Sequence, residues 1–191
     1  MTLIQSLVRL ALVTAFLLLI PLVAMQFTAE VNWTFSDFVF AGVLLFGAGL
    51  TFILVARMST NATYRVAAGV GVAAGLLLLW ANAAVGLVGS EDNPANLLYL
   101  GVPAVALIGA LVARFRPLGM SNAMFAASLT YIVVTAIALF VWTPTGVAAE
   151  PQVKLLNLLI ANGVFAAIWA VSGWLFRRAS TTGSDLTRRL A

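Results

Sequence analysis

The sequence of 191 residues contains no cysteine and no histidine. Without cysteine the chain cannot form disulfides or use a thiolate nucleophile, and without histidine it has no imidazole base. The usual ligand sets of zinc, haem and iron–sulfur sites also depend on these two residue types. We therefore expect no bound cofactor, and carboxylates are the only side chains that a protein environment could bring to titrate near neutral pH.

Charged residues are scarce as well, at 8% of the chain, where roughly a quarter is usual in soluble proteins. Hydrophobic residues make up 63% of the sequence, and the mean hydropathy is +1.09. This composition predicts a chain whose main partner is the lipid bilayer. The net charge of +4 does not indicate a nucleic-acid partner, because the charges fall at the ends of apolar runs, where basic residues meet anionic lipid.

Six apolar runs predict an all-α integral membrane bundle of six transmembrane helices in three hairpins. Each run is long enough to cross the bilayer at about 1.5 Å per residue, and the expected helices cover about 7–25, 38–56, 66–88, 97–113, 122–142 and 155–176. They form one transmembrane domain over residues 1–178. Pro117 is expected to stop the fourth helix. Residues 179–191 are polar, so we expect a mostly disordered cytoplasmic tail.

Basic and acidic residues separate to opposite sides of the predicted helices. One side holds Arg9, Arg57, Arg65, Arg114, Arg116, Arg177, Arg178, Arg188 and Arg189, and the other holds only Lys154. The acids show the reverse, with Asp185 beside the arginines and the rest opposite: Glu30, Asp37, Glu91, Asp92 and Glu150. Because basic residues mark the cytoplasmic side, both termini are predicted to be cytoplasmic.

The third predicted helix carries small residues at a spacing of four, namely Ala67, Gly71 and Gly75. This spacing places them on one face, where another backbone can approach closely. We expect a helix–helix contact at this face.

Signatures of catalysis and ion transport are missing from the sequence. No charged residue lies deep in a predicted helix, which argues against a proton or ion pathway. The chain also has no G-x-S-x-G elbow, Walker loop or H-E-x-x-H motif. We therefore predict no catalytic residues.

The densest group of polar side chains lies in the outer turn between the third and fourth predicted helices. Hard oxygen ligands are close together here, supplied by Glu91, Asp92, Asn93 and Asn96. They could hold a cation such as calcium, although the spacing is not that of an EF-hand loop. The alternative is structural: Ser90 or Asp92 caps the fourth helix, Asn93 and Pro94 form its entry, and the acids lie at its positive end.

Three more polar side chains are predicted at a similar depth beneath this turn: Asn82, Thr135 and Asn162. They form either a ring of interhelical hydrogen bonds or the lining of a small pocket open to the outside. Aromatic residues near the same boundary are interpreted as interface anchors, namely Trp33, Trp80, Tyr99 and Trp142. Trp169 lies deeper and is interpreted as a packing residue.

The stretch from Trp80 to Asn96 has the pattern W-x-N-x-A-V-G-x-x-G-S-E-x-N-P-A-N. It resembles the core of a family of small bacterial multi-pass inner-membrane proteins. The resemblance covers about the third and fourth predicted helices. It implies a bacterial inner-membrane location and carries no activity or mechanism.

Three functions are therefore open. The first is a non-enzymatic accessory or scaffold protein that acts through helix packing, as a homo-oligomer or with a partner membrane subunit. The second is a component that binds or transports a small molecule or cation through the outer acidic turn. A membrane enzyme is the third.

Overall fold

The computed structural model describes residues 2–88, 92–142 and 155–189, and within these ranges every regular element is a helix. Six of the helical segments are long and apolar enough to cross a membrane. The prediction of an all-α chain with six such helices is therefore confirmed. Their pairing in three hairpins and the side on which the termini lie remain predictions.

The chain divides into two compact units, Met1–Leu54 and Val55–Ala191. The first contains α1 (Leu3–Ala24) and most of α2 (Phe35–Ala56). Thr2 caps α1 in a reciprocal arrangement with Gln5, and Asp37 accepts hydrogen bonds from the amide and hydroxyl of Thr34 at the start of α2. Two glycines of α2 adjoin leucines of α1, so these two helices pack with small residues at their contact.

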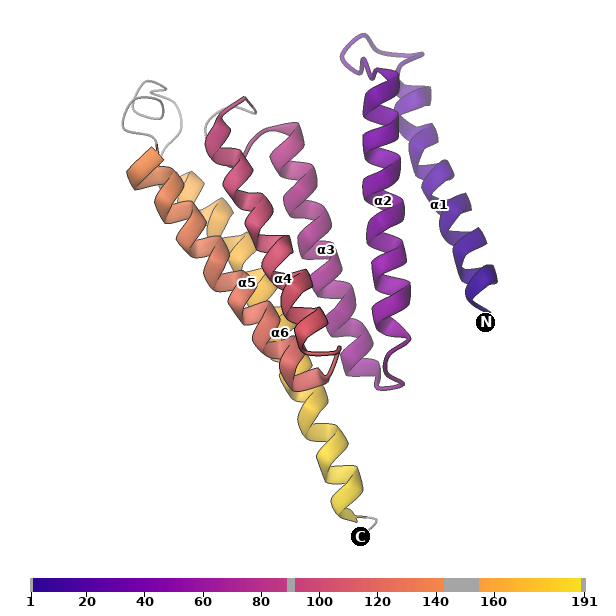
Figure 1. Cartoon of the computed structure of the whole chain (residues 1–191). Helices are drawn as coiled ribbons and strands as arrows, with labels where there is room; N and C mark the ends of the chain where they lie inside the picture. Colours follow the sequence, from indigo (N-terminus) through magenta and orange to yellow (C-terminus); the bar gives the residue numbers. More distant parts are fainter. Residues whose placement is uncertain (1, 89–91, 143–154, 190–191) are drawn as a thin grey trace. The chain divides into compact units, whose positions relative to one another are not determined.

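The second unit is built from four membrane-crossing segments. These are α3 (Ala62–Ala84), the 3-10 helix η1 (Pro94–Leu100) continued by α4 (Gly101–Val112), α5 (Pro117–Ile137) continued by the π-helix η2 (Ala138–Trp142), and α6 (Leu155–Arg189). Helix α6 packs against both α3 and α5, and α5 also packs against α4 (Figure 1).

The small-residue face of α3 lies against α6, as the spacing predicts. The Ser172 hydroxyl donates to the Ala67 carbonyl at 2.9 Å. A Cβ added at Gly71 would come within 2.9 Å of the Ser172 oxygen, and one added at Gly75 would lie 3.7 Å from the Trp169 ring. The two backbones can approach this closely because α3 presents no larger side chain there.

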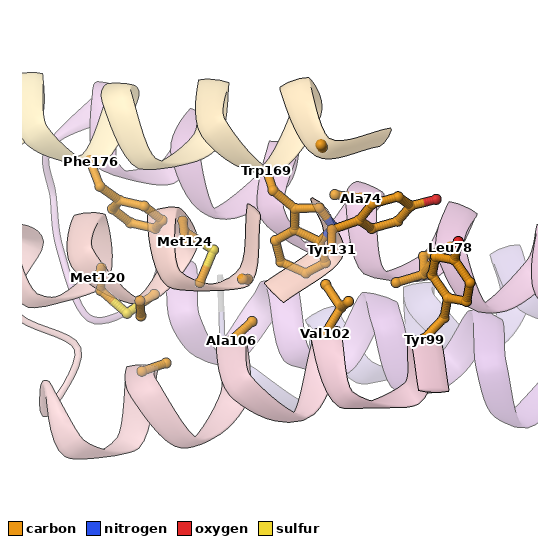
Figure 2. Close-up of a cluster of buried hydrophobic side chains, with 14 of the residues drawn as sticks. Ala74, Leu78, Tyr99, Val102, Ala106, Met120, Met124, Tyr131, Trp169 and Phe176 are labelled. Atoms are coloured by element: carbon orange, nitrogen blue, oxygen red, sulfur yellow. The ribbon is translucent and has the colours of Figure 1, made fainter. Parts of the chain in front are cut away.

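The core of the second unit lies between these helices and combines aromatic, methionine and small side chains (Figure 2). Trp169 is 2% exposed, in agreement with its predicted packing role, and Phe176 meets Tyr64 edge to face at 5.0 Å between ring centroids. Tyr99 is fully buried. Its prediction as an interface anchor is therefore wrong, because its ring packs edge to face against Tyr131 inside the unit.

Two predicted helix ends are also wrong. Helix α5 begins at Pro117 and not at about residue 122, because proline suits the first helical position, where its missing N–H has no partner to lose. Helix α6 continues to Arg189, through most of the segment predicted to be disordered. Extending an existing helix needs no new nucleus, and the buried Ala179 anchors the start of this extension.

Candidate functional site: the polar turn and the buried polar cluster

The turn between α3 and η1, which we call the polar turn, is closed by the side chain of Asn96. Its Oδ1 accepts hydrogen bonds from the amides of Leu87 at 2.9 Å and Val88 at 3.0 Å. Gly86 has a φ of 70°, a conformation that glycine adopts without steric cost. Asn96 is only 3% exposed, so this oxygen satisfies two backbone donors with both lone pairs and is not placed to ligate an ion.

Asn82 approaches the same turn from the last part of α3. Its Nδ2 donates to the Asn96 carbonyl at 3.1 Å, while its Oδ1 is buried without a hydrogen-bond partner within the described part of the chain. Asn82 therefore ties α3 to η1, and it does not join Thr135 and Asn162 in a ring.

The cap of η1 is Asn93, whose Oδ1 accepts from the Ala95 amide at 2.9 Å. The prediction that Ser90 or Asp92 caps this helix named the wrong residues but the right kind of interaction. Ser90 and Glu91 lie outside the described residues. Asp92 is exposed, and among the described residues no group of three or more histidine, cysteine or acidic side chains could hold a metal ion.

Thr135 and Asn162 come together as predicted, with two tyrosines between them. The Asn162 Oδ1 accepts from the hydroxyls of Tyr131 at 3.0 Å and Tyr99 at 3.1 Å, and the Thr135 hydroxyl lies 3.4 Å away. The Thr135 hydroxyl donates to the Tyr131 carbonyl at 2.9 Å and lies 3.0 Å from the Tyr99 hydroxyl, whose single hydrogen is shared between Thr135 and Asn162. We call Tyr99, Tyr131, Thr135 and Asn162 the polar cluster.

The polar cluster joins three helical segments and is linked to the polar turn. Tyr99 comes from η1, Tyr131 and Thr135 from α5, and Asn162 from α6. The Asn162 Nδ2 donates to the Leu87 carbonyl at 3.5 Å. One set of hydrogen bonds therefore holds together the end of the second unit at which the polar turn lies.

Sequence reasoning missed both tyrosines. A signal for Tyr131 was present, because Tyr131 and Thr135 are four residues apart and share a helix face. Tyr99 gave no such signal, since an aromatic residue near a predicted boundary is typical of an interface position.

Three members of the polar cluster, Tyr131, Thr135 and Asn162, line a groove between α6 and the segment formed by α5 and η2. The groove has a volume of about 200 Å³ and is mostly apolar, with Ile132, Leu139, Phe140 and Leu159 among its lining residues. A Cβ added at Gly163, which also lines it, would meet no atom within 4 Å. Thr135 and Asn162 therefore bond helices together and also line this groove, whereas Asn82 lies outside it.

Chemically, the arrangement donates and accepts hydrogen bonds between helices and offers apolar space beside them. The chain matches no protein-family model, no curated protein and no solved structure. The residues themselves therefore carry every inference about function.

Proposed function

We propose that this chain is a non-enzymatic bacterial inner-membrane protein that acts as a scaffold or accessory subunit through helix packing. The observation that carries this proposal is the polar cluster. Two of its side chains, Thr135 and Asn162, were offered by the sequence as ligand-site residues, and the cluster bonds across helices through Tyr99 and Tyr131. Polar groups used in this way hold a membrane bundle in one arrangement.

The first unit supplies the surface for association. Thr14 is the single buried residue of α1, whereas α3 has six and α5 nine. Because so few residues of α1 are buried, most of its surface is available to lipid or to another membrane helix. The partner is a second copy of this chain or a different membrane subunit.

Cysteine cross-linking in native membranes tests this role, because the chain has no cysteine of its own. A thiol-linked photoreactive group would be placed at Val13→Cys in α1 or at Leu107→Cys in α4; the two native side chains are each 55% exposed. We expect a discrete protein adduct from position 13 and only lipid adducts from position 107. Lipid adducts alone at both positions would refute association through α1.

The topology belongs to the same proposal, with three hairpins and both termini in the cytoplasm. It is supported by the separation of arginines from acids along the chain. An impermeant thiol reagent applied to intact cells should label Asp92→Cys and should spare Ser59→Cys. Labelling of Ser59→Cys alone would show the opposite orientation.

A second candidate function is the binding of a small molecule, and the groove beside the polar cluster favours it. A ligand that binds only the folded protein raises its stability according to its concentration and affinity. Thermal unfolding would be screened with divalent cations, polar metabolites and apolar solutes. Gly163→Leu should abolish stabilisation by a solute that occupies the groove, and Asp92→Asn should abolish stabilisation by a cation held at the turn. Absence of any stabilisation of the wild type would exclude this candidate for the compounds screened.

A further inference from the structure

The connection between α4 and α5 ends α4 in a Schellman motif. The Arg114 amide donates to the Leu111 carbonyl at 2.9 Å, and the Phe115 amide donates to the Ala110 carbonyl at 3.1 Å. These are the two bonds that define the motif. The residue at the Arg114 position is usually glycine, because its φ is positive.

Here the position holds an arginine with a φ of 51°, and Phe115 follows with a φ of 58°. Consecutive non-glycine residues in the left-handed region carry steric strain. The surrounding structure fixes this conformation, since the buried Tyr64 donates its hydroxyl to the Phe115 carbonyl at 2.8 Å. Close packing of Gly119 on Ala113 fixes the other side of the turn. The strain is therefore kept at an exposed cation, where a glycine would avoid it.

Other exposed arginines belong to segments that reach this end of the second unit: Arg65, Arg116, Arg177 and Arg178. Hydrogen bonds and ring contacts bring their segments together. Tyr64 contacts both the Phe115 carbonyl and the Phe176 ring, and the Asn61 Nδ2 donates to the Ala179 carbonyl at 3.5 Å. The start of α3, the α4–α5 turn and residues 176–179 of α6 therefore meet at this end (Figure 1).

The N-terminus of α5 adds to the positive potential of this end. Arg116 is its N-cap residue and makes no side-chain capping bond, and the first turn has no acidic residue. The first turn of a helix carries partial positive charge and attracts anions. Here that partial charge lies beside guanidinium groups instead of the usual acidic or hydroxyl cap.

We propose that Arg114, with Arg65, Arg116, Arg177 and Arg178, binds the phosphate headgroup of an anionic phospholipid. Charge complementarity identifies the ligand class, and the position at the ends of membrane-crossing helices identifies lipid as its source. Arg178 lies 4.5 Å from the centre of the Trp174 ring, and Trp174 is 49% exposed, as is typical of an aromatic residue at a membrane interface. A topology signal requires only an arginine somewhere near this helix end. The presence of one at a strained position therefore indicates that positive charge is needed at residue 114.

Replacement of Arg114 tests the proposal because charge and strain can be removed separately. Arg114→Gln removes the charge and keeps the strain, Arg114→Gly removes both, and Arg114→Lys keeps both. Each variant would be purified in phosphatidylcholine nanodiscs with increasing amounts of phosphatidylglycerol, and stability would be measured at each composition. Inorganic phosphate added to phosphatidylcholine nanodiscs distinguishes free anion from lipid.

Phosphatidylglycerol should stabilise the wild type and the lysine variant. The apparent affinity should fall about fivefold in the glutamine and glycine variants, as expected for loss of one basic residue near an anionic surface. The glycine variant should nevertheless be the most stable in phosphatidylcholine alone. Unchanged phosphatidylglycerol affinity in both neutral variants would overturn the proposal, and so would equal stabilisation by inorganic phosphate.

Discussion

The turn after α3 and the turn after α4 are each held by a buried side chain, but different residues occupy their positive-φ positions. Both contain a positive φ, and at both a buried side chain from outside the turn bonds to the turn backbone. The turn after α3 uses Gly86 and the side chain of Asn96, whereas the turn after α4 uses Arg114 and the hydroxyl of Tyr64. At the first turn the positive φ falls on a glycine, which adopts it without strain. At the second it falls on an exposed arginine, at a position where glycine is favoured.

The acidic and basic ends of the second unit also differ in what their polar and charged side chains do. The polar turn has the residue types of a cation site, yet its asparagine oxygens accept hydrogen bonds from backbone amides. The sequence indicates only a topological role for the arginines, yet Arg114 has a strained, left-handed backbone conformation. Backbone conformation therefore distinguishes the asparagines, whose side chains support the polar turn, from Arg114, whose positive φ is unfavourable for a residue with a side chain.

The largest expected effect tests whether Asn96 alone closes the polar turn. Asn96→Ala leaves the amides of Leu87 and Val88 without their acceptor, and unsatisfied buried groups cost about 1–3 kcal/mol each. We expect the free energy of unfolding to fall by about 3 kcal/mol, measured by titration with a denaturing detergent. Asn93→Ala removes only a helix cap and should cost about 1 kcal/mol. Equal losses in the two variants would mean that the cap, and not Asn96, holds the turn.

A smaller loss of stability is expected for a substitution in the middle of α3, the helix that connects the two ends of the second unit. Gly71→Leu places a side chain against the Ser172 hydroxyl of α6 and should destabilise by about 2 kcal/mol through overpacking. Gly163→Leu makes the same change on α6, where an added Cβ meets open space, and should stay within about 0.5 kcal/mol of wild type. Similar losses would show that intrinsic helix effects dominate and that the α3–α6 contact does not set the spacing.

Much of the architecture could be predicted because hydrophobic run length is a strong signal in a membrane protein. All six membrane-crossing segments correspond to apolar runs of the sequence, and the spacing of Ala67, Gly71 and Gly75 identified a helix contact. Helix ends were less predictable. Pro117 either follows one helix or begins the next, and only the tertiary position of the turn decides between these roles.

The candidate site was predictable only in part. Thr135 and Asn162 were identified as neighbours from their similar depth, but depth does not specify rotation about the helix axis. Asn82 consequently bonds to the polar turn, and Tyr99 points inward to the polar cluster. The strain at Arg114 had no sequence signal, because a left-handed arginine is visible only in the backbone.

Substitutions at Gly86 and Arg114, one positive-φ position in each of these turns, should change stability by about 1 kcal/mol in opposite directions. Gly86→Ala introduces strain at a φ of 70° and should destabilise by about this amount. Arg114→Gly relieves strain at a φ of 51° and should stabilise, with the gain reduced by the entropy of glycine in the unfolded chain. Thermal unfolding in a neutral detergent measures both. A loss of stability in Arg114→Gly would mean that the arginine side chain supports the fold, and the contrast between the turns would disappear.

The smallest expected effects come from removing tyrosine hydroxyls from the polar cluster. They test whether the cluster is structural, as the polar turn is. Tyr131→Phe and Tyr99→Phe each remove one hydroxyl, and a hydrogen bond between membrane helices contributes about 0.6 kcal/mol. Because both hydroxyls bond to the Asn162 Oδ1, either single variant leaves that oxygen one good donor. The double variant removes both of these donors, and the Thr135 hydroxyl lies farther from the oxygen, at 3.4 Å. We therefore expect the double variant to lose more stability than the sum of the single losses in a double-mutant cycle. Additive losses would show that the two tyrosines act independently and that Asn162 does not couple η1 to α5 and α6.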